Sequence, residues 1–314
     1  MWVRNNRSRQ QTMMKFRSWV ILSSAFLFIQ IPLAAQAKGQ STFLRQSLEI
    51  AQSEVEPEVL APEVAPAEIG VSDTARLEAI QLYNNGVDKL TSGDFNGAIT
   101  DFTAALELDP TDADTFYNRG YSYHVLGNYQ AAFEDYGSAT ELNPEFADAF
   151  GNRCYAAYLL KNYDEALVSC EAAIALKDNN PDFFVNRGNT YDDLAVIASD
   201  SGDTELAAQY HEQAIADYDT AIGLKPEHAK AYYNRALAYN RISDHLAAVT
   251  DYSASIERSS NFAEAYFNRG ISYYQLDQLE LAIADLTKAA EIFGEQNQIE
   301  NQSQALELLE TIQP

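Results

Sequence analysis

Six asparagines recur at one position of a repeated pattern, and their side chains suit hydrogen bonding to another polypeptide. They are Asn84, Asn118, Asn152, Asn186, Asn234 and Asn268. A primary amide donates and accepts at once, so it pairs with a peptide main chain whatever the peptide's sequence. Helix propensity does not favour asparagine at such a position. Two alternatives stay open: duplication left the asparagines there, or their amides bond within the protein's own scaffold.

Aromatic and acidic residues flank these asparagines. We predict peptide contacts from the aromatic residues Tyr117, Tyr121, Tyr155, Tyr158 and Tyr233 and from the acidic residues Asp114 and Asp148. Amides, aromatic rings and carboxylates together favour an extended partner segment with basic or apolar side chains.

No arrangement of side chains predicts catalysis. The four histidines form no pair at metal-ligand spacing. The sequence has no Gly-rich phosphate loop, no Gly-x-Ser-x-Gly elbow and no His-Glu-x-x-His motif. We therefore expect a protein that is not an enzyme and that needs no metal and no cofactor.

A unit of 34 residues positions these side chains, and residues 113–146 show it most clearly. Residues three or four apart, such as Phe116, Gly120 and Tyr123, share one face of a first helix. A second helix follows and ends before Pro144, because proline cannot continue it. Each unit predicts a helical hairpin with one apolar face, which copies of the unit bury by stacking.

This pattern resembles the tetratricopeptide repeat, in which a large residue, Leu-Gly, Tyr, Ala, Phe and Pro stand at fixed offsets. Arg replaces the Leu in five copies, and Asn85 replaces it in the first. The resemblance covers residues 79–314 and implies an all-α fold, a right-handed solenoid of six hairpins plus a C-terminal capping helix. We expect a bacterial protein, and one that is exported because of the N-terminal segment described below. The expected domain is 75–314, with repeats 79–112, 113–146, 147–180, 181–228, 229–262 and 263–296 and the cap at 297–314.

The fourth copy is longer than the others. Gly188 and Ala214 are 26 residues apart, whereas the equivalent Gly120 and Ala132 are 12 apart. We expect the extra residues to add about two turns to each helix, with Gly202 and Asp203 between them. The extension is either a tolerated insertion or a second contact site, including one for a second copy.

The resemblance also bears on the asparagines. Members of the family that hold extended peptides use an asparagine ladder at this position. Other members grip chaperone C-termini with a clamp that needs Lys one residue before the ladder residue and Asn three residues after it. The residues in those places are Tyr83 and Val87, Tyr117 and Tyr121, and Gly151 and Tyr155. We therefore do not expect chaperone-tail binding.

Charged and sulfur-containing residues also fall on the packed faces. Arginines follow five of the ladder asparagines, and we expect Asp101, Asp135, Asp217, Asp251 and Asp285 on second helices to pair with such residues, within or between repeats. The only cysteines, Cys154 and Cys170, are a candidate disulfide. Against it, antiparallel packing should place Cys154 nearest Ala166 and leave Cys170 about one turn away.

The N-terminus predicts export. Residues 1–37 hold a basic start, an apolar run and a small-x-small site, as in a secretory signal cleaved after Ala37. The alternative is an uncleaved membrane anchor. Residues 38–74 are acidic, with several prolines, and predict a disordered linker. The net charge of −25 disfavours nucleic acid as a partner.

We predict a non-enzymatic scaffold of the periplasm, or of an equivalent envelope compartment, that holds a partner's extended segment in a concave groove. Its task would be to assemble or stabilise an envelope complex. Two alternatives remain: a periplasmic carrier of metal ions that uses the acidic groove, and a self-association module that works through the fourth hairpin. The partner's identity and the oligomeric state stay open.

Overall fold

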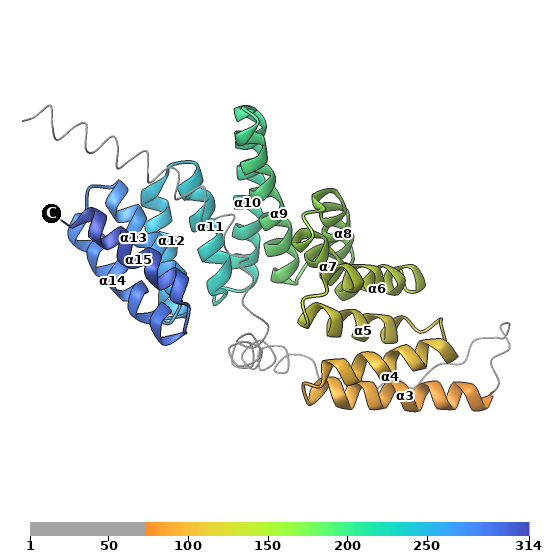
Figure 1. Cartoon of the computed structure of the whole chain (residues 1–314). Coiled ribbons are helices and arrows are strands. Elements are labelled where there is room, and N and C mark those ends of the chain that lie inside the picture. The colour runs from red at the N-terminus through yellow and green to blue at the C-terminus, as the bar shows by residue number, and fades with distance from the viewer. Residues whose placement is uncertain (1–72, 314) are drawn as a thin grey trace, which may run out of the picture. The chain divides into compact units, whose positions relative to one another are not determined.

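The computed structural model describes residues 73–313, and within them the chain is helical without strands (Figure 1). Contacts divide the chain into two compact units, residues 67–292 and a unit that contains residues 293–314, and each is described by itself. The helices are α3 (Asp73–Thr91), α4 (Phe95–Leu108), α5 (Ala113–Val125), α6 (Tyr129–Leu142), α7 (Ala147–Leu159), α8 (Tyr163–Leu176), α9 (Pro181–Asp200), α10 (Thr204–Leu224), α11 (Ala229–Arg241), α12 (His245–Arg258), α13 (Ala263–Gln275), α14 (Leu279–Glu295) and α15 (Ile299–Ile312).

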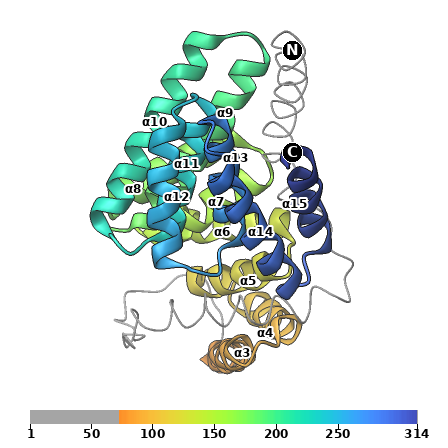
Figure 2. The ribbon, with the colours of Figure 1, turned by 90° about the vertical axis from the view of Figure 1, so that its left-hand side faces the viewer.

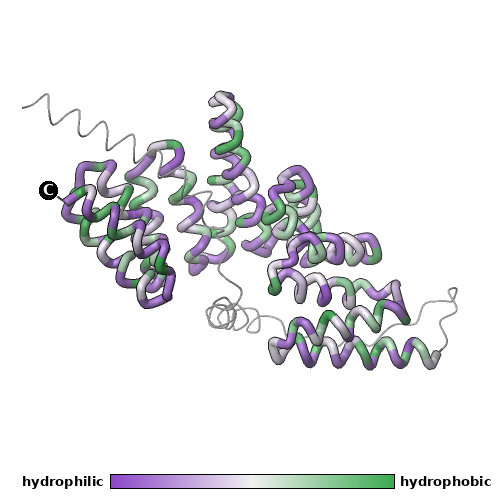
Figure 3. Tube along the Cα trace, in the orientation of Figure 1, coloured by the Kyte–Doolittle hydropathy of each residue, from purple (hydrophilic) through white to green (hydrophobic). Residues whose placement is uncertain are grey.

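Successive helices of residues 67–292 pair into hairpins. The first helix of each hairpin packs on the second, and the second packs on the first helix of the next hairpin. Polar and apolar residues alternate along every helix, as an amphipathic repeat requires (Figure 3). This arrangement confirms the predicted all-α solenoid of helical hairpins.

The predicted starts of the repeats agree with the helices after the first copy. Helices α5, α7, α11 and α13 begin at the alanines that open repeats two, three, five and six, and α9 begins at Pro181. The first helix begins at Asp73 rather than at Ala79, because residues 73–78 include several good helix formers and no proline. The predicted signal segment and linker lie outside the described residues, except for Asp73 and Thr74, which are helical.

The turn inside a hairpin is set by local chemistry. Gly127 has a φ of 78°, which ends α5, and the side chain of Asn128 accepts a hydrogen bond from the backbone N–H of Ala131. Between α9 and α10, Gly202 has a φ of 87° and Asp203 accepts from the N–H of Leu206 at 3.1 Å. The predicted stop and N-cap of the fourth hairpin are thus confirmed.

The extra residues of the fourth hairpin are divided between its two helices, as expected. Helix α9 has 20 residues and α10 has 21, whereas α7 has 13 and α8 has 14. Seven more residues lengthen each helix by about 10 Å. The paired helices extend past the ends of their neighbours (Figures 1 and 2).

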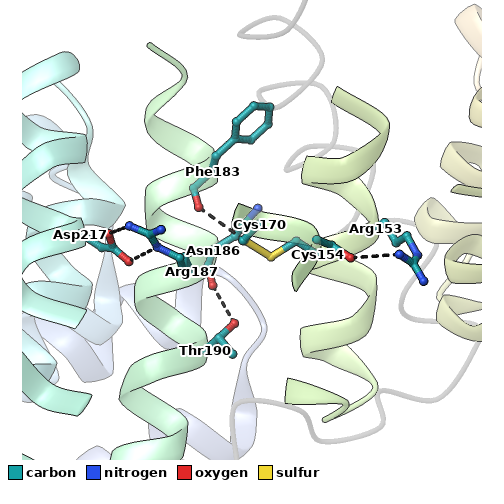
Figure 4. Close-up of a disulfide and its surroundings, with 9 residues drawn as sticks. Arg153, Cys154, Cys170, Phe183, Asn186, Arg187, Thr190 and Asp217 are labelled. Carbon is teal, nitrogen blue, oxygen red and sulfur yellow. Dashed lines mark hydrogen bonds and ion pairs between the residues drawn. A yellow bond between two sulfur atoms is a disulfide. The ribbon is translucent and has the colours of Figure 1, made fainter. Parts of the chain in front are cut away.

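A glycine of the first helix packs beneath an aromatic ring of the second helix in several hairpins. A Cβ at Gly86 would lie 2.5 Å from Cε1 of Phe102, and one at Gly188 would lie 2.7 Å from Cε1 of Tyr218. The equivalent residues of the third hairpin are Cys154 and Cys170, and they form a disulfide with their Cα atoms 5.2 Å apart (Figure 4). The expectation that Cys170 lies one turn too far away is therefore wrong.

The reason is the register in which the two helices pack. Gly120 lies under Tyr136 at the same sequence separation of 16, so residues 16 apart meet wherever the inner turn has its standard length. The cysteines occupy the two positions that touch in the neighbouring hairpin.

An aromatic ring from the fourth hairpin fills space in the core of the third hairpin. In the second hairpin the rings of Tyr117 and Tyr136 lie 5.7 Å apart, but Gly151 and Cys170 stand at these positions in the third. The ring of Phe183 from α9 fills the vacated space, and a Cβ at Gly151 would overlap its Cε1 atom. Sγ of Cys170 lies 3.6 Å from the carbonyl oxygen of Phe183.

We expect Gly151→Ala to destabilise the protein by roughly 1–3 kcal/mol, because the new methyl group would force the buried ring of Phe183 to move. Gly223→Ala is the matched control, since Gly223 is also helical and nothing lies near its added Cβ. That change should stabilise by about 0.4–1 kcal/mol. Urea unfolding of both variants measures the difference in stability. Equal stabilities would contradict the close packing of Phe183 against Gly151.

The sequence predicts a C-terminal helix over Ile299 to Ile312, and α15 has these bounds. Its role as a cap on the last repeat stays a prediction. None of the helices in the described part of the chain has both the length and the apolar character needed to cross a membrane.

Candidate functional site

The first helices of successive hairpins contact one another along residues 67–292. Their faces therefore form one continuous surface, which we call the ladder surface. It comprises the faces of α3, α5, α7, α9, α11 and α13 that carry the six asparagines.

Three of the asparagines bond to the hairpin that precedes them. Each donates its amide Nδ2 to the hydroxyl of the tyrosine that stands one residue before the preceding asparagine. The pairs are Asn118 with Tyr83 at 3.1 Å, Asn152 with Tyr117 at 3.0 Å, and Asn268 with Tyr233 at 3.0 Å. The possibility left open by the sequence, that these amides bond within the scaffold, is thus realised in these hairpins.

The pattern changes at the fourth and fifth hairpins, because no tyrosine stands at the required position. Gly151 precedes Asn152 in the third hairpin, and the side chain of Asn186 has no hydrogen bond to any described residue. Figure 4 shows the hydrogen bond that Thr190 donates to the backbone oxygen of Asn186. Asn234 instead donates to Oδ1 of Asn189 at 2.8 Å.

Asn84 of the first hairpin is exposed, and its side chain likewise bonds to no described residue. The six asparagines therefore have two roles. Four of them join neighbouring hairpins, and the amides of Asn84 and Asn186 bond to no described residue.

The predicted aromatic residues also fall into two groups, one in the interior and one on the ladder surface. The ring of Tyr117 lies 4.8 Å from that of Phe146, and the ring of Tyr233 lies 4.6 Å from that of Phe262, so both are interior residues that support the asparagines. Tyr121, Tyr155 and Tyr158 are half-buried on the ladder surface.

The acidic residues at the start of the first helices remain accessible to solvent. Asp148 pairs with Lys177 at 3.5 Å. Asp182 accepts a hydrogen bond from Nε2 of His228 at 3.0 Å, and that bond holds the pKa of its carboxyl below the ordinary value. Partial burial, together with the neighbouring Asp112, raises the pKa of Asp114.

A cluster that the sequence interpretation missed lies between the fourth and fifth hairpins. The carboxylate of Asp192 in α9 accepts hydrogen bonds from His211 of α10 and Arg241 of α11, and all three side chains are largely buried. Burial works to raise the pKa of Asp192, but Arg241 and His211 outweigh it and leave this pKa low. The adjacent Asp193 accepts a hydrogen bond from Tyr163 at 3.4 Å.

The sequence did hold a signal for this cluster. The pair Asp192-Asp193 aligns with His124 and Val125 of the second repeat, and Arg241 aligns with Val125. Charges of opposite sign at one repeat position in adjacent copies indicate a contact between those copies.

The arginines pair mainly within hairpins, and Arg235 also pairs with Asp219 of the preceding hairpin. Four of the five arginines donate two hydrogen bonds to the aspartate of the second helix in their own hairpin, with N–O distances between 2.7 and 2.9 Å. The pairs are Arg119 with Asp135, Arg187 with Asp217, Arg235 with Asp251, and Arg269 with Asp285. Arg153 pairs with Glu165 instead, because Ser169 stands at the aspartate's position. Asp101 pairs with Lys89, since the first repeat has no arginine.

His124 predicts a pH dependence of stability. Burial lowers its pKa from 6.5 to about 4, and its buried Nδ1 has no hydrogen-bond partner. Between about pH 4 and 6.5 the unfolded chain therefore binds a proton at this histidine and the folded chain does not. The free energy of unfolding should be highest above pH 6.5 and fall as the pH drops from about 6.5 to 4.

We expect His124→Leu, which copies Leu90 of the first hairpin, to flatten this part of the stability curve. Each unit of the pKa shift is worth about 1.4 kcal/mol. Urea midpoints of both proteins between pH 7.5 and 4 measure the effect, and parallel curves would contradict it.

The described residues bring together no three histidine, cysteine, aspartate or glutamate side chains that could hold a metal ion. The metal-carrier alternative therefore gains no support from the geometry of residues 73–313.

Comparison with known proteins gives consistent results. A TPR repeat family model matches residues 90–127, and tetratricopeptide repeat models match residues 113–146, 193–261 and 263–295. Together these matches span about half of the chain. No curated protein has a significant sequence match to it.

Three solved structures show the same fold. The MamA protein is 25% identical with a TM-score of 0.50, and the match covers 60% of this chain and 94% of MamA. A thermophilic TPR protein of Thermus thermophilus is 20% identical with a TM-score of 0.54, over 62% of this chain and 99% of that one. A tetratricopeptide repeat protein from Parabacteroides merdae is 19% identical with a TM-score of 0.54, over 89% and 97%. The last two likenesses bear on the fold alone.

Proposed function

The chain belongs to the tetratricopeptide repeat family, and from this premise we propose that it is a non-enzymatic scaffold that holds an extended segment of a partner protein on the ladder surface. The observation that carries the proposal is the pair of uncommitted amides at Asn84 and Asn186 on a continuous surface of half-buried tyrosines. Asn118 and Asn152 each use one N–H for a tyrosine, which leaves the amide oxygen for a peptide N–H.

The charge of the chain supports a basic or apolar partner. The net charge is −25, and Asp114, Asp148, Asp182 and Glu264 start the first helices of four hairpins on the ladder surface. This field attracts basic segments and repels nucleic acid.

We further propose that the protein works outside the cytoplasm, where it assembles or stabilises an envelope complex. The disulfide between Cys154 and Cys170 supports an oxidising compartment, because such bonds are rare where thiols are kept reduced. The secretory signal expected over residues 1–37 points to the same compartment.

Site-specific photo-cross-linking in cells tests the proposal. A benzophenone amino acid at Tyr121 on the ladder surface should form adducts with a partner protein. The matched control places the same group at Val168 of α8, which is 60% exposed on a second helix. Adducts at Val168 but none at Tyr121 would exclude the ladder surface as the binding site.

A further inference from the structure

We propose that the ladder surface holds a seat for one lysine or arginine side chain of the partner segment, formed where α7 and α9 meet. The seat consists of the carboxylate of Asp193 and the rings of Tyr155 and Tyr158, and the free amide of Asn186 fixes the partner's main chain beside it. This inference rests on the proposed function and names the side chain that the surface selects.

The residues of α9 that form the seat share one face of the helix. Asn186, Asn189 and Asp193 are separated by three and then four residues, so they lie in one row along the helix. Helix α9 contacts α7, which carries Tyr155 and Tyr158. The two sets of side chains therefore belong to neighbouring helices of the same surface.

The two carboxylates in this region differ in their partners. Asp192 is matched by Arg241 and His211. Asp193 forms no ion pair with any described residue, and Tyr163 donates a weak hydrogen bond to it. Arg241 lies near enough to attract Asp193, but it donates its hydrogen bond to Asp192 and forms no ion pair with Asp193. An incoming basic side chain can therefore supply the cation that this half-buried carboxylate lacks.

The tyrosines supply aromatic faces for the same cation. The rings of Tyr155 and Tyr158 lie 6.2 Å apart and nearly parallel, and the ring of Tyr163 lies 6.3 Å from that of Tyr158. All three are half-buried, so each ring keeps part of its surface open. Aromatic faces attract ammonium and guanidinium groups, and more strongly where the site is partly desolvated.

Asn186 sets the register of the bound segment. It lies seven residues before Asp193, which is about 10 Å along the helix. An extended peptide advances about 3.3 Å per residue, so the basic side chain should stand about three residues from the one whose main chain bonds Asn186.

Selection from a random peptide library on the immobilised chain without its expected signal segment, residues 38–314, tests the seat. The selected peptides should share one lysine or arginine, and replacing it with norleucine or citrulline should weaken binding about tenfold or more. Raising the salt concentration should weaken the basic peptide more than the neutral one.

Asp193→Asn should abolish the difference between the basic and neutral peptides and leave binding of the neutral peptide unchanged. Asp200→Asn, at the exposed end of the same helix, is the control and should keep the difference. Asn186→Ala should weaken both peptides equally, and a thermal melt unchanged from wild type shows that the fold is intact.

The outcomes separate the two proposals. If peptides are selected without a shared basic residue, or if Asp193→Asn keeps the preference for it, the seat is wrong and the ladder surface remains the binding site. If no peptide is enriched at all, the proposed function fails and the seat fails with it.

Discussion

Replacing Arg241 with methionine is expected to lower the free energy of unfolding by about 3–5 kcal/mol, because the change leaves the carboxylate of Asp192 buried without its cation. Methionine keeps most of the length of the arginine side chain, so packing changes little and the lost charge dominates. Urea unfolding measures the loss. Hydrogen exchange should place it in α9 and α11, since a stack of repeats can open locally.

A second variant separates the loss of the ion pair from simple damage. The double change Asp192→Leu and Arg241→Met removes both charges, and it should be more stable than Arg241→Met alone. If the single variant loses less than about 1 kcal/mol, the cluster is not the buried ionic contact between hairpins that the geometry indicates.

Removing the disulfide is expected to cost about 3 kcal/mol, the value for a closed loop of this size. The third hairpin should be especially sensitive because it lacks the tilted aromatic pair of the second and fifth hairpins. Small residues such as Ala157, Ala166 and Ala173 line its interior instead. The variant Cys154→Ala, Cys170→Ala and the reduced wild type should lose similar amounts in urea unfolding.

The measurement that localises this effect is hydrogen exchange across α7 and α8. Exchange there should accelerate on reduction of the wild type, whereas reductant should leave the double alanine variant unaffected. Unchanged protection of α7 and α8 after reduction would contradict a role for the disulfide in holding this hairpin.

Most of the fold could be predicted because its signals are local. Gly127 permits the turn, Asn128 caps the next helix, and Pro144 prevents its continuation. Gly93, Asp94 and Pro110 repeat these signals 34 residues earlier. The lengthening of the fourth hairpin could be predicted for the same reason. The N-terminal extension of α3 was missed because no cap or proline marks the boundary of the first repeat.

The site could be predicted only in outline, because its chemistry depends on how neighbouring hairpins stack. The position of the ladder asparagines on one helix is enough to identify them. That Asn118 reaches Tyr83, 35 residues earlier, depends on the offset between two hairpins, which the period alone does not specify. The unbonded amide of Asn186 follows from the same offset, since Gly151 offers no hydroxyl group.

The ring of Phe183 over Gly151 limits how far the array is modular. Clean excision of residues 147–180 would preserve the period and join the second hairpin directly to the fourth. Phe183 would then meet the rings of Tyr117 and Tyr136 instead of a glycine and a cysteine. The third and fourth copies should therefore tolerate deletion or transplantation only when they are moved together.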